Sequence, residues 1–442
     1  MQELTRTKKI RSIIAASSGN LVEWFDFYIY AFTATYFAHT FSTSDNPVIQ
    51  QINAFGVFAA GFFMRPIGSW LFGSLADKVG RKKSMVISVV LMALGSFMIA
   101  ALPSKDTVGD LAIILLLIAR LIQGLSVGGE YGIAATYLSE LATEGKRGFY
   151  SSFQYVTLIG GQLLAVASIS IMFLFFSIDD MKDYAWRILF VIGGILALGS
   201  LFVRKMMNES ATKLHQHEDR GTLKALCKSW KPFLMVLGVT SGGSLAFYTI
   251  TTYTKTFMEN TGMDKMLVNN LFLGALFILM IIQPLFGYIG DKIGHKRSLI
   301  VFCILALVGI YPIFSLIANN ARNNPSLTFM LVVLLFVILS FYTSVAGIFK
   351  AKLFPEHVRA LGTGLGYAIS NAVFKGSAPW VALQFKNAGI ENGFFIYIAI
   401  FTIIMLIATL CLPKNQSLIN FNAFKESAES AVLSNSFKVL NL

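Results

Sequence analysis

The sequence predicts an all-α membrane protein whose twelve transmembrane helices form two six-helix bundles. Three observations carry this prediction. Hydrophobic residues make up 55% of the 442 residues and charged residues only 13%, which is about half the charged share of a soluble domain. Apolar stretches of about 20 residues, long enough to cross a bilayer, recur along the chain. A loop motif from the first half of the chain returns in the second half.

Every apolar stretch of spanning length is predicted to be a helix, because irregular backbone facing lipid would leave polar groups unpaired. The predicted spans are 18–40, 52–76, 84–103, 110–139, 149–177, 185–204, 233–258, 266–290, 298–319, 327–352, 359–385 and 392–412. We therefore expect an N-terminal bundle (1–204), a linker (205–232), a C-terminal bundle (233–412) and a polar tail (413–442).

The basic residues are distributed unevenly between the two sets of predicted loops. Of 36 Lys and Arg, 25 lie in one set of alternate loops and the termini, and 5 lie in the opposite set. This bias predicts that both termini, the linker and the tail are cytoplasmic. The net charge of +13 is thereby explained by membrane topology, so we expect lipid and no nucleic acid as a partner. The first apolar run has no cleavage site and is expected to be retained.

Several chemistries lack a signal in the sequence. The three cysteines, Cys227, Cys303 and Cys411, are too few for a disulfide framework. Five scattered histidines form no metal-binding pattern, and no phosphate-binding loop for ATP is visible. No nucleophile lies in a pattern with a base. We expect no enzyme activity, no cofactor and no metal.

The repeated loop motif shows that the two halves are related. Residues 71–84 read LFGSLADKVGRKKS and residues 285–298 read LFGYIGDKIGHKRS, with eight of fourteen positions identical at an offset of 214. A second match, at an offset of 212, aligns Leu141, Arg147 and Tyr155 with Leu353, Arg359 and Tyr367. Parallel repeats of this kind are typical of carriers whose site lies between the halves near the bilayer midplane.

The same motif predicts a cytoplasmic gate. Asp77 can accept hydrogen bonds from the N-terminus of a neighbouring helix and so hold the halves together on the inner side. The alternative is a turn followed by a charge cluster that only sets topology. His295 replaces the arginine in the second copy, which predicts a weaker latch there. The candidate gate residues are Gly73, Asp77, Arg81, Asp291, Arg147 and Arg359.

Acidic side chains lie on one face of the first predicted span. Asn20, Glu23, Asp26 and Tyr30 share that face at 100° per residue. A carboxylate at membrane depth costs several kcal/mol unless it is paired, solvated or protonated. Glu23 and Asp26 are therefore candidates for proton carriage. The alternative is a structural ion pair with an arginine of a neighbouring helix.

The fourth predicted span carries a cation beside further polar groups. Arg120, Gln123 and Glu130 lie within an arc of about 80°. The planar fork of Arg120 suits a carboxylate, although a fixed ion pair with Glu130 or a first-span acid remains an alternative. Glu130 is a third candidate proton carrier. Gly124, Gly128 and Gly129 are expected to let a neighbouring helix approach closely.

Five more cations lie within predicted spans: Arg65, Arg187, Lys255, Lys350 and Lys375. Arg187, Lys255 and Lys350 lie near span ends, where we expect them to snorkel towards water. Arg65 and Lys375 are deep, and Tyr367 and Asn371 share a face with Lys375.

The seventh predicted span carries a polar stripe of Ser244, Tyr248, Thr251 and Lys255, which predicts a hydroxyl-lined wall or, alternatively, hydroxyls that join helices. When the first and last position of each span are left out, six bases face three acids, Glu23, Asp26 and Glu130. Because buried cations are costly without a compensating anion, the count favours an anionic substrate.

Long segments of the chain resemble the metabolite:H⁺ symporter family of the major facilitator superfamily. They are SSGNLVEWFDFYIYAF (17–32), GVFAAGFFMRPIGSWLFGSLADKVGRKKSM (56–85), RLIQGLSVGGEYGIAATYLSE (120–140) and FPEHVRALGTGLGYAISNAVF (354–374). SFQYVTLIGGQLLA (152–165) and SFYTSVAGIFKAKLFP (340–355) are similar to family members that transport 2-oxoglutarate.

The resemblance implies proton-coupled uptake of 2-oxoglutarate across the bacterial inner membrane by a monomer. It also implies functional roles for the acids named above and for Arg65, Arg120 and Lys350. With Lys375, Gln123 and Tyr248 these bases form the predicted substrate site. Lys375 departs from the family pattern and adds a positive charge. Alternatives are a symporter of a zwitterionic osmolyte, shikimate or citrate, and, from another class, a membrane sensor with a carrier fold.

Overall fold

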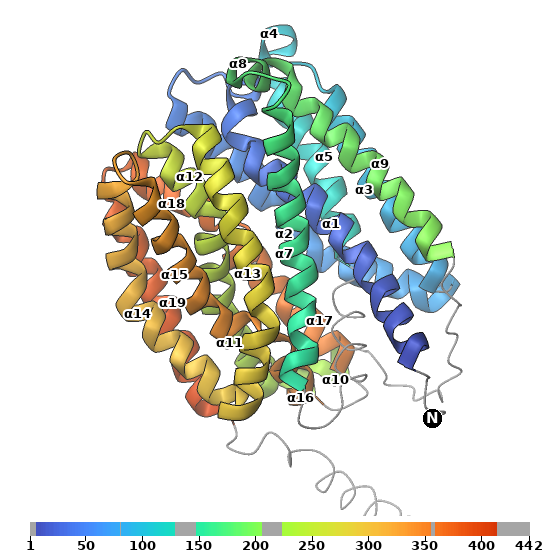
Figure 1. Cartoon of the computed structure of the whole chain (residues 1–442). Helices are drawn as coiled ribbons and strands as arrows, with labels where there is room; N and C mark the ends of the chain where they lie inside the picture. Colours follow the sequence, from blue (N-terminus) through green and yellow to red (C-terminus); the bar gives the residue numbers. More distant parts are fainter. Residues whose placement is uncertain (1–5, 80, 129–146, 206–222, 355–358, 413–442) are drawn as a thin grey trace, which may run out of the picture.

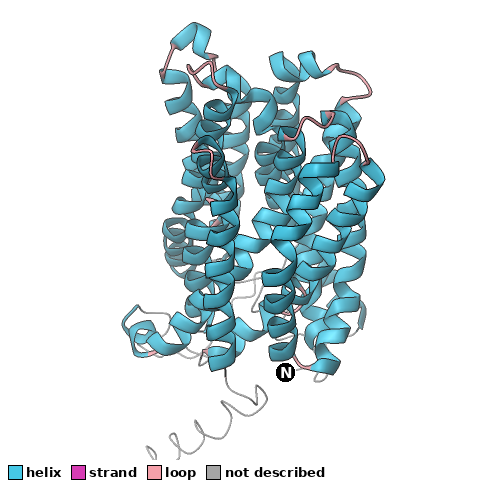
Figure 2. Cartoon of the chain, turned by 90° about the vertical axis from the view of Figure 1, so that its left-hand side faces the viewer, coloured by secondary structure: helices cyan, strands magenta, loops and turns pink. Residues whose placement is uncertain are grey.

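The computed structural model describes residues 6–79, 81–128, 147–205, 223–354 and 359–412. Within these ranges the chain is helical with short connections, as Figure 2 shows. The helices of the first half are α1 (Arg6–Phe41), α2 (Pro47–Val79), α3 (Arg81–Ala101), α4 (Lys105–Val108), α5 (Leu111–Val127), α7 (Arg147–Met172), α8 (Ile178–Asp180), η1 (Met181–Ala185) and α9 (Trp186–Lys205).

The second half follows the same pattern of long helices and short connections. Its helices are α10 (Leu223–Lys228), α11 (Trp230–Tyr248), η2 (Thr249–Tyr253), α12 (Thr254–Asn260), α13 (Lys265–Ile293), α14 (His295–Asn320), α15 (Pro325–Thr343), α16 (Ala346–Leu353), α17 (Arg359–Ser370), η3 (Asn371–Lys375), α18 (Ala378–Asn387) and α19 (Glu391–Cys411). Helical segments thus coincide with all twelve predicted spans. For the span predicted at 110–139, the described part ends at residue 128.

The long helices have the length and composition of membrane spans. Among the described residues, eight helical segments are long and apolar enough to cross a bilayer, and Val86–Ala101 and Leu111–Val127 are shorter apolar helices. Large apolar side chains also lie on the outside of the molecule. Trp70 is 67% exposed and Val308 is 71% exposed. Lipid is the solvent that such a surface requires.

Local sequence signals set several helix ends in the second half. The side chain of Asp264 accepts a hydrogen bond from the backbone N–H of Leu267 at 2.8 Å and so caps α13. Asn324 caps α15 in the same way and precedes Pro325 at the first helical position. Gly294, with φ of 94°, separates α13 from α14 in a conformation that other residues rarely adopt.

The two halves of the chain form two groups of helices, α1 to α9 (blue to green) and α11 to α19 (yellow to red) (Figure 1). The groups meet where α7 packs against α13, and where α2 packs against α17, η3 and α18. We call the end near the N-terminus the lower end and the end that carries α4 and α8 the upper end, as in Figure 1.

Glycines bring α2 and α5 into direct backbone contact. A Cβ at Gly124 would overlap the carbonyl oxygen of Gly61, and one at Gly128 would overlap the carbonyl oxygen of Arg65. This close approach agrees with the expectation for Gly124 and Gly128; Gly129 lies outside the described residues. The contact fixes the spacing between Arg65 on α2 and Arg120 on α5.

Candidate functional site

Four basic side chains are buried where the two groups of helices meet. Arg65 (α2) is 4% exposed, Arg120 (α5) and Lys350 (α16) are 0% exposed, and Lys375 (η3) is 1% exposed. We call these four residues the central basic cluster. Each half of the chain contributes two of them, and all four were predicted as site residues.

The expectation that Lys350 snorkels to the membrane surface was wrong. Its side chain is fully buried. The predicted span at 327–352 was treated as one helix, but α15 ends at Thr343 and a new helix begins at Ala346. This break resets the helical register, so the face on which Lys350 lies could not be extrapolated from the preceding residues.

Aromatic rings surround the two arginines. The guanidinium carbon of Arg65 lies 3.9 Å from the centroid of the Phe62 ring and 4.3 Å from that of Phe27. That of Arg120 lies 4.1 Å from the Phe27 centroid and 4.3 Å from that of Tyr30. The negative faces of these rings stabilise the cations in a site without bulk water.

The two lysines share an aromatic partner in the second half. Lys375 Nζ lies 3.5 Å from the hydroxyl of Tyr367, as their shared helix face predicted. Lys350 Nζ lies 4.4 Å from the centroid of the Tyr367 ring. Lys375 also approaches the rings of Trp24 and Tyr248, at 4.3 and 4.8 Å. Because Trp24 belongs to α1, Lys375 contacts both halves of the chain.

Some donors of the two arginines find no acceptor among the described residues. Within the described ranges, Nε and Nη2 of both Arg65 and Arg120 are buried and lack a hydrogen-bond acceptor. Leaving a buried donor unsatisfied costs about 1–3 kcal/mol, and more for a charged group. These nitrogens are therefore well placed to bind a ligand with planar pairs of acceptors, such as a carboxylate.

The predicted acids of the first span are also buried. Asp26 is 0% exposed and Glu23 is 4% exposed. Asp26 accepts hydrogen bonds from Ser96 Oγ at 2.5 Å and from Gln123 Nε2 at 2.7 Å. Gln123 in turn accepts one from Arg120 Nη1 at 2.6 Å. Asp26 and Arg120 are thus connected through an amide, an arrangement that the sequence analysis did not anticipate. Glu130 lies outside the described residues.

The polar stripe of the seventh span makes protein contacts along its length. Ser244 donates to Asn371 Oδ1 at 3.0 Å within the second half. Thr251 accepts from Gln162 Nε2 of α7 at 3.1 Å, across the two halves. The stripe therefore joins helices in this conformation, which was the alternative reading of its hydroxyls.

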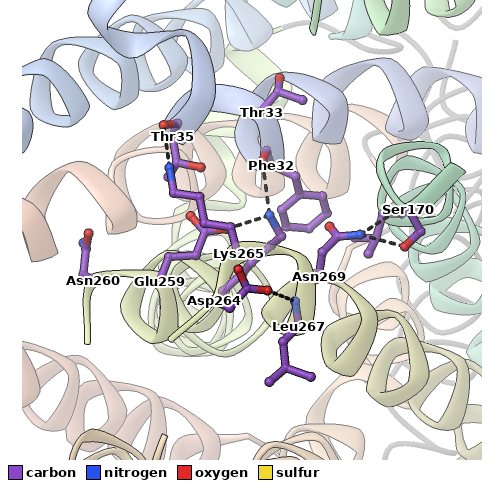
Figure 3. Close-up of polar contacts among 12 residues, drawn as sticks. Phe32, Thr33, Thr35, Ser170, Glu259, Asn260, Asp264, Lys265, Leu267 and Asn269 are labelled. Atoms are coloured by element: carbon purple, nitrogen blue, oxygen red, sulfur yellow. Dashed lines mark hydrogen bonds and ion pairs between the residues drawn. The ribbon is translucent and has the colours of Figure 1, made fainter. Parts of the chain in front are cut away.

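A buried ion pair lies on α12, which is nearer the upper end (Figure 1). Figure 3 labels its acidic member, Glu259. Lys255 Nζ is 2.9 Å from Glu259 Oε1, and both side chains are 2% exposed. Lys255 also donates to the carbonyl oxygen of Phe32 on α1, at 3.3 Å. The expectation that Lys255 snorkels was therefore wrong. Glu259 was missed because the span was predicted to end at 258, whereas α12 continues to Asn260.

Further contacts join the halves around this ion pair (Figure 3). Lys265 Nζ donates to the carbonyl oxygen of Thr35 on α1 at 3.3 Å. Asn269 Nδ2 on α13 donates to Ser170 Oγ on α7 at 2.7 Å and to the carbonyl oxygen of Val166 at 3.2 Å. These contacts join the two halves at the upper end.

At the lower end, Asp291 caps the N-terminus of α7. Its carboxylate accepts the backbone N–H of Gly148 at 2.6 Å and that of Phe149 at 3.0 Å. His295 Nε2 lies 3.0 Å from the same carboxylate. This contact joins the halves in the way proposed for Asp77, and the gating role itself stays a prediction. The predicted gate residues Gly73, Asp77, Arg81 and Arg359 lie where no side chains are described, and Arg147 is the first residue of α7.

Comparisons with known proteins place this architecture in a family. A sequence model of the Major Facilitator Superfamily matches residues 16–314 and 270–441. The chain belongs to the major facilitator superfamily. The α-ketoglutarate permease of Escherichia coli is 49% identical to it over 409 residues, which cover 92% of this chain and 94% of the permease. A citrate-proton symporter of Klebsiella pneumoniae is 34% identical over 85% of each chain.

A solved structure of a major facilitator protein has the same fold. The xylose transporter XylE of E. coli, in a partially occluded inward open conformation, superposes with a TM-score of 0.72 at 18% identity and covers 93% of this chain and 99% of its own. The predicted fold class, twelve helices in two six-helix bundles, is confirmed. The present chain is therefore a transporter and a multi-pass protein of the bacterial inner membrane. These matches indicate no enzyme family.

Proposed function

We propose that this protein is a proton-coupled symporter that imports a small dicarboxylate, 2-oxoglutarate, by alternating access. The observation that carries the proposal is the central basic cluster, drawn in equal parts from both halves. Among the described residues of the site, four bases stand against the acids Glu23 and Asp26. The bases therefore exceed the acids by two positive charges, which the two negative charges of a dicarboxylate would neutralise. Similarity to a permease named for α-ketoglutarate supports the choice of substrate.

In the proposed binding mode, Arg65 and Arg120 hold one carboxylate through the nitrogens that lack an acceptor in the described part of the chain, and Lys350 and Lys375 hold the other. The buried hydroxyl of Tyr248 is a further donor. Because the ligand neutralises cations of both bundles (residues 1–204 and 233–412), its binding favours a conformation in which the bundles close around it. This gives the ligand the differential affinity that a conformational change requires.

We further propose that the upper end faces the periplasm and that both termini lie in the cytoplasm of a monomeric carrier. The contacts of Lys255 and Lys265 with α1 would then break when the site opens outward, and those of Asp291 would break when it opens inward. Cysteines introduced near Asp45 and Asp180 should react with a membrane-impermeant reagent from outside, and one near Arg220 only after permeabilisation. Labelling near Arg220 in intact cells contradicts this topology.

Proton coupling follows from the membrane potential. Each negative charge moved into a negative cytoplasm costs about 2.3 kcal/mol per 100 mV, so a dianion alone is opposed by about 4.6 kcal/mol at 100 mV. Two protons per dianion make the step electroneutral. We therefore propose at least two protons per dianion, or fewer if the substrate enters partly protonated. The proposed carriers are Glu23, Asp26 and Glu130. If one of these acids carries the coupling proton, its amide variant should lose uphill accumulation but keep exchange of labelled for unlabelled substrate. Accumulation driven by a pH gradient in all three variants would place the proton site elsewhere.

The substrate is tested by uptake of labelled 2-oxoglutarate into proteoliposomes. Arg120→Ala should abolish uptake and binding, and Arg120→Lys should restore them only in part because a point charge lacks the bidentate fork. Lys182→Ala, which removes a cation from the exposed pair with Asp179, serves as the matched control and should leave uptake unchanged. Unchanged affinity in Arg120→Ala removes this residue from the site. Stronger competition by citrate or by a betaine than by unlabelled 2-oxoglutarate contradicts the proposed substrate.

A further inference from the structure

Gln123 separates two buried opposite charges. Its amide nitrogen donates to Asp26 Oδ2 at 2.7 Å, and its amide oxygen accepts from Arg120 Nη1 at 2.6 Å. All three side chains are 0% exposed. The carboxylate and the guanidinium therefore lie at opposite ends of one amide group. Opposite charges attract strongly in a medium of low dielectric constant, so a neutral side chain between them has to be held in place.

Ser96 holds the carboxylate from another side. Its hydroxyl donates to Asp26 Oδ1 at 2.5 Å, and its oxygen accepts a hydrogen bond from Gln123 Nε2 at 2.9 Å. Both oxygens of Asp26 are thus bonded to neutral donors. Behind the carboxylate, the backbone of α9 is so close that a Cβ at Gly193 would overlap Asp26 Oδ1. Both carboxylate oxygens of Asp26 therefore accept hydrogen bonds, and the backbone of α9 leaves no room for the carboxylate to move towards that helix.

Arg120 is correspondingly available to a ligand. One of its nitrogens is bonded to Gln123, and its Nε and Nη2 have no hydrogen-bond acceptor in the described part of the chain. A direct ion pair with Asp26 would occupy the planar fork that the substrate carboxylate needs. A direct pair would also make substrate affinity depend strongly on whether Asp26 is protonated.

We propose that Gln123 and Ser96 are positioning residues that keep Asp26 out of a direct ion pair with Arg120, so that the guanidinium stays open to the substrate anion. The proposal rests on the proposed function of Arg120 as a substrate ligand. It changes the role of Gln123, which the sequence analysis assigned to substrate contact. Without the amide spacer, Asp26 and Arg120 collapse onto each other and the substrate has to break their pair.

The surroundings identify Asp26 as the group whose charge decides this competition. On α1 the neighbouring titratable groups are Glu23 and Tyr30, and the Tyr30 ring lies 4.3 Å from the guanidinium carbon of Arg120. On the facing helices the charged groups are Arg65 of α2 and Arg120 of α5, which both contact the Phe27 ring. The described residues that α3 and α9 bring to the Asp26 carboxylate, Ser96 and Gly193, are neutral.

The test measures the dissociation constant of 2-oxoglutarate for the purified full-length protein in detergent, where no gradient acts. Gln123→Ala should weaken binding about tenfold or more relative to wild type at about pH 8, because a direct ion pair then competes with the ligand. Ser96→Ala should shift affinity in the same direction by less.

The decisive variant combines Gln123→Ala with Asp26→Asn. Asparagine removes the competing charge at every pH, so this double variant should bind within about threefold of Asp26→Asn alone, less than the tenfold effect of the single change. If the double variant binds as poorly as Gln123→Ala, Gln123 contacts the substrate or supports the fold, and the spacer proposal is wrong. Arg120→Ala separates the two proposals, because retained affinity in that variant removes Arg120 from the site whatever Gln123 does.

Discussion

Replacing Glu259 by glutamine should open the upper end of the protein. The Glu259→Gln change keeps the size of the side chain and removes its charge. In this variant the carbonyl oxygen of Phe32 on α1, at 3.3 Å, remains as an uncharged hydrogen-bond acceptor for the Lys255 ammonium. Removing one partner of a buried ion pair costs about 3–5 kcal/mol, because the remaining charge is buried without compensation.

That cost applies only to the conformation in which Lys255 is buried. When the upper end opens, the ammonium of Lys255 meets water and the penalty disappears. Because 1.4 kcal/mol corresponds to a factor of ten, a penalty of about 3 kcal/mol or more lowers the ratio of closed to open molecules on the order of a hundredfold.

Labelling of a single cysteine measures this shift. Thr35→Cys places a thiol beside the contact of Lys265 with α1 and is introduced after the three native cysteines have been replaced by serine. The rate of reaction with a membrane-impermeant thiol reagent added from outside should rise on the order of a hundredfold in Glu259→Gln. Circular dichroism of the same sample checks that the variant is folded.

A matched control uses an ion pair of equal length at the surface. Lys182 and Asp179 also lie 2.9 Å apart, but their side chains are 40% and 87% exposed. Exposed pairs contribute about 0–1 kcal/mol, so Asp179→Asn should leave labelling unchanged. The double change Lys255→Met with Glu259→Leu should label at a rate near the parent's, since neither charge is then buried. Equal labelling in Glu259→Gln and Asp179→Asn would refute the reasoning.

Two further predictions concern packing and the lower end. Gly124→Ala places a Cβ on the carbonyl oxygen of Gly61 and should cost about 1–3 kcal/mol of stability. Thermal unfolding of this variant in detergent should show a lower Tm. The control variant Gly199→Ala, whose Cβ would have nothing within 4 Å, should leave the Tm unchanged. Asp291→Asn weakens the charge-assisted hydrogen bond to the Gly148 N–H and should slow uptake while equilibrium substrate binding persists. Loss of both uptake and binding with a normal Tm would place Asp291 in the substrate site.

The sequence predicted those features of the protein that depend on a residue and its near neighbours along the chain. Hydropathy located the spans, because each residue's preference for lipid over water depends little on its neighbours. Arg65, Arg120 and Lys375 were recognised because a charge at membrane depth is costly wherever the helix packs. Lys350 entered the predicted site only through the family resemblance. Lys255 and Glu259, at i and i+4, carried a local signal too, and this pair was missed only because the span was ended one residue early.

The partners of these charges depended on tertiary structure. Asp26 meets Ser96 and Gln123, which are 70 and 97 residues away in sequence, and nothing in the sequence of α3 marks one of its three serines as the partner of a distant acid. Lys255 and Lys265 bond to backbone carbonyls of α1, and every residue has such an acceptor, so no side-chain pattern predicts which is used. The amino-acid sequence by itself placed charges such as Arg65 and Lys375 at membrane depth, because depth follows from the position of a residue within an apolar stretch. The burial of Lys255 and Lys350 required the tertiary structure. Only the packing of the helices decided which of the charges meet, because that depends on the rotation and spacing of helices distant in sequence.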